Sequence, residues 1–590
     1  MGSSTLQRRD FFARLATTGN GGQEPVSASH PDPLPTDEAF KKYANKTVPF
    51  QDVVRTMAGI TPHSDTLAED DVLHLLRRTT FGAPKATVDL LGTMTLTQAV
   101  DYLVDNPVMP ATKPLNNYQN TYADTQGCPF GVSWVDYAAP DNSDGTLNTY
   151  RTGYSFKPWW MAQMIGQQTH VLEKMVLFWH NHFSTQTGVT NAPKAVWGHF
   201  NMLRNNALGN FRTLVKGVTV DPHMLIYLNG NSNSKTAPDE NYGRELQELF
   251  MVGKGPDSHY TEDDVKAAAK VLTGWRRVLN ATDGSYSSTF NSGAHDTGNK
   301  QFSAFYNNTV INGQTGAAGA NETDALINMI LGTTECAKYI VRCLYRWFVY
   351  YTIDDTAEAN VISPLADIFR NNNYDISPVL KALFKSEHFF DPANRGCIIK
   401  SPIDLYVSMV REFNLQLPSS PIDVQYTYWK YLSDRAAAEA QNIGDPPNVS
   451  GWLAYYHAPQ YYETWISSAT IQLKENNLNN FTKSGVSTGG NSFRMKVDTI
   501  AFVKQFPTPE DPNAVVANCI KYLLPQDLSA TQKAYLKSIL LSNQVTDSYW
   551  TTAWNAYIAA PTDPTLLGTV KSRLDTMINY MVSLEEYLLY

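Results

Sequence analysis

Two histidines separated by a single residue are the first feature of this sequence that could carry chemistry. The stretch FWHNHFST, residues 178–185, places His180 and His182 in an otherwise apolar segment. On an α-helix with 3.6 residues per turn, side chains two positions apart point about 200° away from each other. The two imidazoles can therefore bind one metal ion only if the helix ends or unwinds near Asn181, and the polar residues that follow favour such an end. The alternative is a pair of core histidines bonded to different carbonyl groups.

A pair of glutamates forms the second candidate. The segment NYGRELQELF places Glu245 and Glu248 three residues apart, so their carboxylates share one face of a helix. Such a pair can bind a metal ion, or divide acid and base roles when the surroundings drive the two pKa values apart. In the alternative, Arg244 simply forms an ion pair with Glu248. The Asn- and Ser-rich loop just before this helix, residues 229–240, favours a functional site.

A third group of polar residues lies in the loop segment AHDTGNK. His295, Asp296 and Lys300 offer a base, a carboxylate and a cation close together in sequence. A turn stabilised by the aspartate side chain is the alternative interpretation.

Two further motifs have weaker chemical signatures. In HLLRRTTFG, Arg77 and Arg78 adjoin His74 near the end of a helix, and we expect ion pairs at the surface in preference to an anion site. The segment PPNVSGW, residues 446–452, has the stiff and small residues of a packed turn. Its Trp452 either forms the wall of a pocket or anchors the core.

The elements that must position these residues are predicted to be helices. Helical periodicity begins near residue 70 and includes a segment at 260–275 in which Thr261 and Asp264 form an expected N-terminal cap. Irregular segments separate the helices, and a small hairpin is expected within residues 278–320. The sequence predicts a mainly α fold: a large multi-helix body with long loops and at most a small β hairpin. The remaining helices are expected near 86–107, 156–183, 193–206, 208–217, 241–253, 322–331, 334–351, 356–371, 375–386, 401–414 and within 494–590, and the long loops at 110–155, 229–240 and 444–452.

Composition excludes several classes of protein. Hydrophobic residues make up 43% and charged residues 17% of the 590 residues, which is typical of a globular chain. The net charge of −9 argues against a nucleic-acid binder, and no apolar run is long enough for a transmembrane helix. The five cysteines form no CxxC pair, which excludes a zinc ribbon. GxSxG, GxxxxGK[ST], HExxH and GxGxxG motifs are absent, which disfavours α/β-hydrolases, P-loop NTPases, zincins and Rossmann folds.

The chain divides into three predicted regions. Residues 1–65 are expected to form an N-terminal tail that is partly disordered, residues 66–480 a helical core domain, and residues 481–590 a C-terminal helical extension packed on that core. Within the tail, Arg8 to Phe12 read RRDFF, which resembles a twin-arginine export signal. The apolar region that normally follows such a signal is missing, because the next residues are small and polar.

Several segments together resemble one family over about residues 66–480. The chain is similar to the bacterial family catalogued as domain of unknown function 1800, whose usual Asn-Glu-Asn appears here as Asp239-Glu240-Asn241. The resemblance implies a bacterial protein, exported to the periplasm or the cell exterior, with a partner resembling alkaline phosphatases and sulfatases. It is carried by the segments HLLRRTTFGAP, KMVLFWHNHFST, LIYLNGNSNSK, ENYGRELQELFMVG, YTEDDVKAAAKVLTGW, HDTGNK, IKSP and PPNVSGW.

Two functions of different classes follow from these motifs. In the first, the protein is a hydrolase of a glycan or a peptide-like polymer, with a divalent metal such as zinc, manganese or iron, or with a glutamate base oriented by histidine. In the second, it is a non-catalytic binding or assembly protein of the cell envelope, with a polysaccharide or the phosphatase-like protein as partner. Convergence of the histidines and glutamates in an open cleft would favour the enzyme, whereas histidines bonded to backbone would favour the scaffold. The candidate catalytic residues are Glu245, Glu248, His295 and Asp296, and the candidate metal ligands are His180, His182 and Glu245.

Overall fold

The computed structural model describes residues 58–139, 144–488 and 492–590. The predicted tail lies almost wholly outside these residues, as does the RRDFF segment. The chain divides into two compact units. Among the described residues, the larger unit comprises the chain up to residue 462 with 487–488, 492–495 and residue 590, and the smaller unit comprises residues 463–486 and 496–589.

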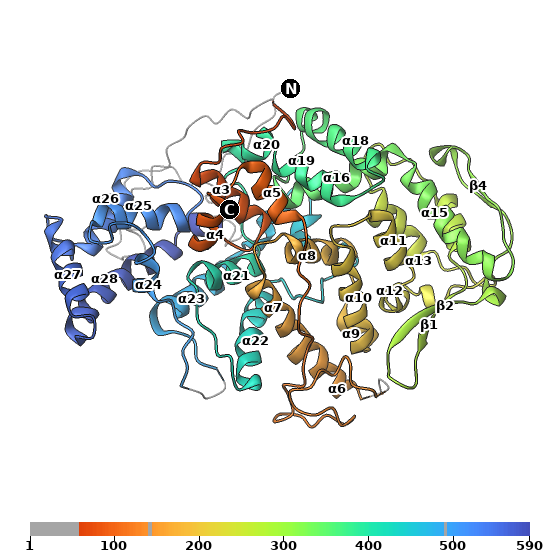
Figure 1. The fold of residues 1–590 in the computed structure, drawn as a ribbon. Coiled ribbons are helices and arrows are strands. Elements are labelled where there is room, and N and C mark those ends of the chain that lie inside the picture. The colour runs from red at the N-terminus through yellow and green to blue at the C-terminus, as the bar shows by residue number, and fades with distance from the viewer. Residues whose placement is uncertain (1–57, 140–143, 489–491) are drawn as a thin grey trace, which may run out of the picture. The chain divides into compact units, whose positions relative to one another are not determined.

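Helices build the larger unit, which confirms the predicted mainly α class (Figure 1). Those with α geometry are α3 (Glu69–Thr79), α4 (Lys85–Leu91), α5 (Leu96–Val104), α6 (Gly145–Thr149), α7 (Lys157–Gly166), α8 (Leu172–His182), α9 (Thr187–Thr190), α10 (Pro193–Asn206), α11 (Phe211–Thr219), α12 (Pro222–Tyr227), α13 (Asn241–Glu245), α14 (Glu262–Val271), α15 (Asn321–Leu331), α16 (Thr334–Phe348), α17 (Asp355–Ala357), α18 (Ser363–Asn371), α19 (Ile376–Phe384), α20 (Glu387–Phe390), α21 (Pro402–Glu412) and α22 (Ile422–Ala438).

Wider and tighter helical turns extend several of these helices. The π-helical segments are η1 (Tyr150–Phe156), η3 (Leu246–Met251) and η7 (Glu358–Ile362) in the larger unit and η11 (Asn480–Ser484) in the smaller one. The short 3-10 turns are η2 (Gly230–Ser232), η4 (Ser292–Ala294), η5 (Ala304–Tyr306), η6 (Gly316–Ala320), η8 (Pro392–Asn394), η9 (Leu453–Tyr455), η10 (Tyr461–Trp465) and η12 (Glu585–Leu588).

Strands among the described residues form two small antiparallel hairpins. Strand β1 (Trp275–Leu279) pairs with β2 (Tyr286–Phe290), and β3 (Lys300–Gln301) pairs with β4 (Val310–Ile311). Both lie in or beside the segment where a small hairpin was predicted.

The smaller unit is also helical. Its longest helix, α28, packs against α24, α26 and α27. The helices of this unit are α23 (Ser468–Asn479), α24 (Thr499–Val503), α25 (Pro512–Leu523), α26 (Ala530–Leu540), α27 (Ser548–Ala559) and α28 (Pro564–Val582).

The segment predicted as a long surface loop, residues 110–155, is only partly a loop. Its last eleven residues are helical in α6 and η1, and several polar side chains of the segment are buried. Arg151 and Asp124 form an ion pair of 2.9 Å with side chains 1% and 0% exposed. Polar composition therefore misled the prediction, because these side chains satisfy one another inside the unit rather than facing water.

Helix α8 lies at the centre of the larger unit, packed against α7 and α10 (Figure 1). All of its residues are buried, as the apolar sequence predicts. The charges within it are paired: Glu173 accepts two hydrogen bonds from Arg204, at 2.6 and 3.0 Å, and Lys174 forms an ion pair with Asp404. These pairs matter because an unpaired charge at such a depth would cost several kcal/mol.

Candidate functional site

The FWHNHFST stretch forms the last turn of α8 and the residues after it. The helix continues through Asn181 and ends at His182, where Phe183 leaves helical geometry with φ −100° and ψ 59°. Ser184 Oγ donates a hydrogen bond of 2.7 Å to the Asn181 carbonyl and so supports the end of the helix. Because the helix stays regular between the two histidines, their imidazoles point to different sides and meet different partners.

His180 faces the loop that contains GDPPNVSGW. Its Nε2 accepts a hydrogen bond of 3.2 Å from the Gly444 backbone N–H, while its buried Nδ1 has no hydrogen-bond partner among the described residues. Rings of Trp160, Phe200 and Trp452 surround the imidazole at centroid distances of 5.5, 4.6 and 5.5 Å. Burial holds the pKa of His180 well below its usual value, and the nearby His199 and Lys157 lower it further.

Asn181 is hydrogen-bonded to the other end of the same loop, at Trp452. Its Oδ1 accepts a hydrogen bond of 2.9 Å from the Trp452 backbone N–H. Gly451 lies against this side chain with φ +89°, and a Cβ at that position would stand 2.3 Å from Asn181 Oδ1. Only glycine fits there, both sterically and conformationally. Two motifs about 270 residues apart in sequence therefore form one packed unit, and Trp452 is a buried anchor, as its core alternative predicts.

His182 points to the helix that carries the two glutamates. Its Nε2 donates a hydrogen bond of 2.9 Å to the Phe250 carbonyl, in the π-helical segment η3. Burial lowers the pKa of His182 to about 4, against a small opposing effect of this hydrogen bond. The end of α8 thus meets the glutamate helix through a backbone carbonyl rather than through a carboxylate.

Glu245 and Glu248 lie on α13 and η3. Glu245 is half-buried, and its Oε2 is buried and has no hydrogen-bond partner among the residues that the structure describes. Burial raises the pKa of Glu245, and the charge of Glu248 raises it further, against the opposing charges of Lys254 and Arg244. Glu248 forms an ion pair with Lys254.

The predicted alternative of an Arg244–Glu248 ion pair is wrong. Arg244 donates hydrogen bonds of 2.7 Å from both Nη atoms to Glu262, and a longer one of 3.3 Å to Glu240. Glu262 begins the neighbouring helix α14, which packs on α13. Arg244 is therefore turned to α14, and Glu248 remains on the side of Glu245 and Lys254.

Two tyrosines and one aspartate extend the surroundings of the glutamates. Burial raises the pKa of Tyr227, and the charges of Asp445 and Glu245 raise it further, so this phenol lies within the fields of both carboxylates. Burial and the charge of Glu248 raise the pKa of Tyr260 to about 12. Sequence reasoning did not single out Tyr227, Tyr260 or Asp445, although Tyr227 and Tyr260 lie in segments that carry the family resemblance and Asp445 directly precedes another, PPNVSGW.

Asp445 is placed by the loop that His180 holds. It follows Gly444 directly, and its carboxylate accepts hydrogen bonds of 3.0 Å from the Thr187 hydroxyl and forms an ion pair with Lys157. Through Tyr227 this aspartate shares an electrostatic environment with Glu245. We define the acidic site as the partly exposed group Tyr227, Glu245, Glu248, Tyr260 and Asp445.

His295 and Asp296 belong to a different environment. Both ring nitrogens of the buried His295 are engaged: Nε2 lies 3.0 Å from Glu322 Oε1, and Nδ1 lies 2.9 Å from the Thr273 carbonyl. Lys300 completes this network with an ion pair of 2.6 Å to Glu322. Asp296 Oδ1 accepts a hydrogen bond of 2.8 Å from the Gly298 N–H, which is the turn of the alternative interpretation. These contacts fix the loop and do not bring it to Glu245.

The arginines of HLLRRTTFG are buried, so the expectation of surface ion pairs is wrong. Arg78 is fully buried, donates to the Asn394 carbonyl and to Cys397 Sγ, and stacks on Tyr590 with its guanidinium 4.8 Å from the ring centroid. Arg77 is also buried. Neighbouring aromatic and backbone groups replace water around these cations.

The proposed metal ligands do not form one group. His180 and His182 diverge, and among residues 58–139, 144–488 and 492–590 no three His, Cys, Asp or Glu side chains are placed to hold a metal ion. A second buried histidine pair, which the sequence did not suggest, lies near His180: His199 bonds to Asp221 at 3.0 Å, and His223 bonds to Thr190 at 2.8 Å. The five cysteines form no disulfide bond with one another.

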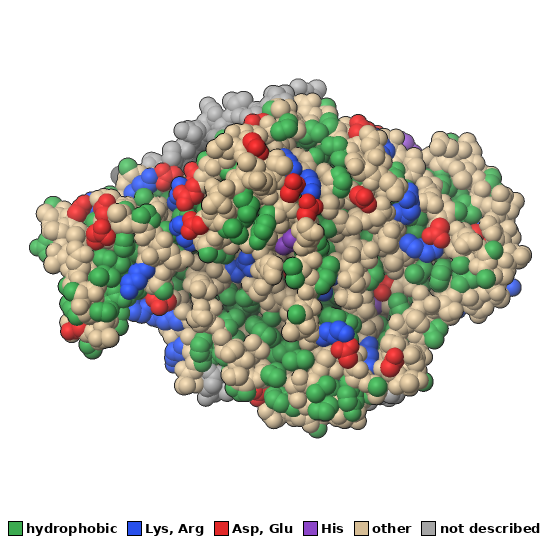
Figure 2. Space-filling model, viewed as in Figure 1, with side chains coloured by type: hydrophobic (Ala, Val, Ile, Leu, Met, Phe, Trp, Pro, Cys, Tyr) green, Lys and Arg blue, Asp and Glu red, His purple; other side chains and the backbone are tan. Residues whose placement is uncertain are grey.

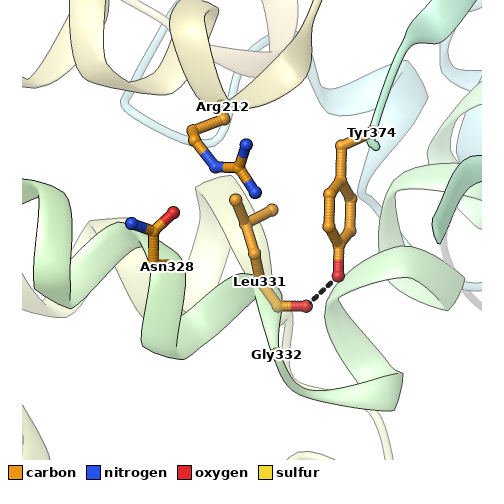
Figure 3. Close-up of a pocket in the computed structure, with 5 residues that line it drawn as sticks. All are labelled: Arg212, Asn328, Leu331, Gly332 and Tyr374. Atoms are coloured by element: carbon orange, nitrogen blue, oxygen red, sulfur yellow. Dashed lines mark hydrogen bonds between the residues drawn. The ribbon is translucent and has the colours of Figure 1, made fainter. Parts of the chain in front are cut away.

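A shallow cavity of about 500 Å³ lies elsewhere on the larger unit and is shown in Figure 3. The Tyr374 hydroxyl donates to the Leu331 carbonyl at its edge, and Arg212 lies over the Tyr374 ring at 5.9 Å. The cavity is lined by Arg212, Asn328, Leu331, Gly332 and Tyr374 and contains no residue of the acidic site.

The protein is mainly α, and its buried helix α8 is hydrogen-bonded both to the 444–452 loop and to the helix that carries Glu245 and Glu248. The family model described as "protein of unknown function (DUF1800)" matches residues 74–588, and the chain belongs to this family. The match continues beyond residue 480, where the resemblance was expected to end. Comparison with curated proteins and with solved structures found no match. No helix in the described part of the chain has both the length and the apolar character needed to cross a membrane.

Proposed function

We propose that the protein is a hydrolase of a glycan or peptide-like polymer in which Glu245 is the general acid. The observation that supports this most is the half-buried carboxylate of Glu245, with a raised pKa and an oxygen that no group within residues 58–139, 144–488 and 492–590 bonds. A carboxylic acid that keeps its proton toward neutral pH can protonate a leaving group. Perturbed carboxylates of this kind concentrate at functional sites.

Glu248 serves as the second carboxylate in this proposal. Glu248 lies three residues from Glu245 and forms an ion pair with Lys254, and as a carboxylate it can accept a proton from the attacking water or stabilise positive charge on the substrate. Tyr227, which lies within the field of Glu245, contributes a hydroxyl group to the same site.

In this proposal the histidines are positioning residues rather than metal ligands. His180 and His182 bond to backbone groups of the 444–452 loop and of η3, and they set the distance between Asp445 and Glu245. This arrangement favours the metal-free version of the hydrolase.

The test is hydrolysis by purified Glu245→Gln protein beside the unchanged chain. Reducing-end release from soluble β-glucan, xylan, chitosan and peptidoglycan, and amine release from casein, cover the two polymer classes. Loss of a general acid typically costs about a hundredfold or more in rate, so we expect such a loss in Glu245→Gln on whichever polymer the unchanged chain hydrolyses. Glu240→Gln is the matched control, because Glu240 lies on the Arg244 side and pairs with it. Equal rates in Glu245→Gln and the unchanged protein contradict the proposal.

A non-catalytic binding or assembly protein of the cell envelope is the second candidate. It is favoured by one observation: both histidines bond to backbone groups, which is the pattern expected of a scaffold. Under this proposal no polymer is hydrolysed, and Glu245→Gln still binds the partner as the unchanged protein does. The activity screen therefore distinguishes the two candidates.

Location and partner are proposed from the family resemblance. We propose a periplasmic or extracellular protein that associates with an alkaline-phosphatase- or sulfatase-like partner. Fractionation of the native cells and co-purification from the envelope fraction test both statements. Recovery of the protein only from the cytoplasmic fraction contradicts them.

A further inference from the structure

A second and larger cavity, of about 790 Å³, lies on the larger unit and contains none of the residues of the acidic site. One wall is α5 with the segment 105–111, and the other is the end of α7 with residues 166–173. Two hydrogen bonds join the walls: His170 Nε2 to the Asp105 carbonyl at 3.1 Å, and the Val171 N–H to the Leu103 carbonyl at 2.9 Å. We call this cavity the α5–α7 groove.

The groove combines amide side chains with exposed apolar ones. Tyr102, Val108 and Met109 are 46%, 59% and 40% exposed, which is unusual for side chains of this size. The amides along the groove are Gln98, Asn106, Gln163, Gln167 and Gln168. Planar amides beside an aromatic face match the alternating hydroxyl and C–H surfaces of a sugar ring.

Gln167 gives the strongest indication of a ligand. Its side-chain oxygen and nitrogen are both buried, and neither has a hydrogen-bond partner within the described residues. Leaving a buried amide unpaired is unfavourable by about 1–3 kcal/mol. Neither atom reaches solvent in the free protein although the side chain as a whole is half-exposed, so a ligand bonds them only when the amide turns into the groove. Two neighbouring hydroxyl groups, which offer an acceptor and a donor side by side, would then satisfy both atoms at once.

The charges at the groove are already compensated by the protein. Asp105 forms an ion pair of 2.6 Å with Lys381, and Asp101 lies 3.2 Å from Lys381 and 3.1 Å from Lys385. Figure 2 shows acidic and basic side chains together in the upper middle of the view, where α5 and α19 meet. Since neither sign of charge is left in excess, the groove suits a neutral ligand better than a phosphate or a basic peptide.

We propose that the α5–α7 groove binds a neutral oligosaccharide, with Tyr102 against the face of a sugar ring and the Gln167 amide turned into the groove to bond neighbouring hydroxyls. The bound oligosaccharide would be the substrate of the proposed hydrolase. Only this role as substrate rests on the proposed function. Binding in the groove requires no catalysis, so a binding experiment separates the failure of one proposal from the failure of the other.

Isothermal titration calorimetry of the full chain with cellohexaose, xylohexaose, maltohexaose and chitohexaose is the direct test. We expect binding of at least one of them, weakened about tenfold by Gln167→Leu, which removes two hydrogen bonds at similar shape. Tyr102→Ala is expected to weaken binding by a similar factor. Tyr549→Ala, at an exposed tyrosine of the smaller unit, is the matched control and is expected to bind as the unchanged chain does.

The thermal unfolding midpoint of each variant shows whether weaker binding results from loss of folding. Gln167→Leu removes an unpaired buried amide, so the thermal midpoint of the free protein is expected to stay equal or rise. Weaker binding together with an unchanged or higher midpoint supports the groove. Three results would overturn it: no saccharide binds at millimolar concentration, the two groove variants bind unchanged, or a hexapeptide of neutral residues binds in place of the saccharides.

Discussion

At the scale of single residues, the motif side chains differ in whether the protein satisfies them. His182 Nε2 donates a hydrogen bond to the Phe250 carbonyl, and His295 Nε2 is bonded to the Glu322 carboxylate. Asn181 Oδ1 accepts a hydrogen bond from the Trp452 backbone N–H. Glu245 differs, since it is half-buried while one of its oxygens has no hydrogen-bond partner in the described part of the chain. This difference is why the proposed chemistry is assigned to Glu245 rather than to the histidines with which the motif begins.

Glu245 also predicts a pH-dependent effect on stability that is independent of any substrate. Its folded-state pKa is raised above the usual 4.5 by burial and then by Glu248, so folding favours the protonated form. The associated stability is fully present below about pH 4.5 and is lost as the pH rises through the folded-state pKa. Glutamine imitates the protonated acid. We therefore expect Glu245→Gln to unfold at a higher temperature than the unchanged chain at pH 7, with a smaller difference at pH 4.

Thermal unfolding followed by circular dichroism across this pH range checks the prediction. Glu262→Gln is the control with the opposite sign, because the hydrogen bond from Arg244 lowers the pKa of Glu262. Its substitution is expected to leave the unfolding temperature at pH 7 unchanged or lower. A rise at pH 7 as large in Glu262→Gln as in Glu245→Gln would show that the burial of Glu245 is not the cause.

At the scale of elements, the sequence predicted helices well where a local signal defines them. The cap of α14 is a case in point: Thr261 Oγ1 accepts from the Asp264 N–H and the Asp264 carboxylate accepts from the Thr261 N–H, as their spacing predicts. Helix α8 was expected from its apolar residues and ends within a few residues of the predicted position. Both signals lie within one or two turns of the chain.

What the sequence could not predict depends on contacts between distant segments. His180 and Gly444 are 264 residues apart, and nothing local shows that they meet. The alternative pairing of Arg244 with Glu248 rested on helical spacing, yet Arg244 donates its hydrogen bonds to Glu262 of the neighbouring helix α14. The glutamate pair of the candidate site was found from spacing alone, whereas Asp445 became part of it only through the fold.

The contact between α8 and the 444–452 loop gives a prediction at this scale. Gly451 has φ +89°, and a Cβ there would lie 2.3 Å from Asn181 Oδ1 and 2.5 Å from the Asn181 carbonyl oxygen. Gly451→Ala is therefore expected to reduce the free energy of unfolding by about 2 kcal/mol or more. It is also expected to expose the loop to limited proteolysis, since the Trp452 N–H would lose its bond to Asn181.

Gly188→Ala is the matched control for this substitution. Gly188 lies in α9, and a Cβ there would meet no atom within 4 Å. Alanine in a helix is favoured over glycine, so a change within about 1 kcal/mol is expected, in the stabilising direction. If urea unfolding shows the same change for both variants, the close approach of Gly451 to Asn181 does not hold the loop.

At the scale of the whole molecule, buried neutral histidines set the response to acid. Burial lowers the pKa of five of them among the described residues, which are His74, His170, His180, His182 and His223. Each has its usual pKa near 6.5 once the chain unfolds. Below that pH the unfolded state therefore binds more protons than the folded state, and stability falls as the pH falls.

His182 allows this dependence to be measured for one group. Its folded-state pKa is about 4, so its contribution is present above pH 6.5 and is lost as the pH falls from there to about 4. One proton difference corresponds to about 1.4 kcal/mol per pH unit, and the whole window to about 3 kcal/mol. We expect His182→Gln to remove that part of the slope, because a glutamine amide can still donate to the Phe250 carbonyl but does not titrate.

The free energy of unfolding in urea, measured from pH 7 to pH 4, gives the slope directly. The absolute stability of the variant at pH 7 does not enter the comparison. A slope in His182→Gln equal to that of the unchanged chain would mean that the folded-state pKa of His182 is not lowered.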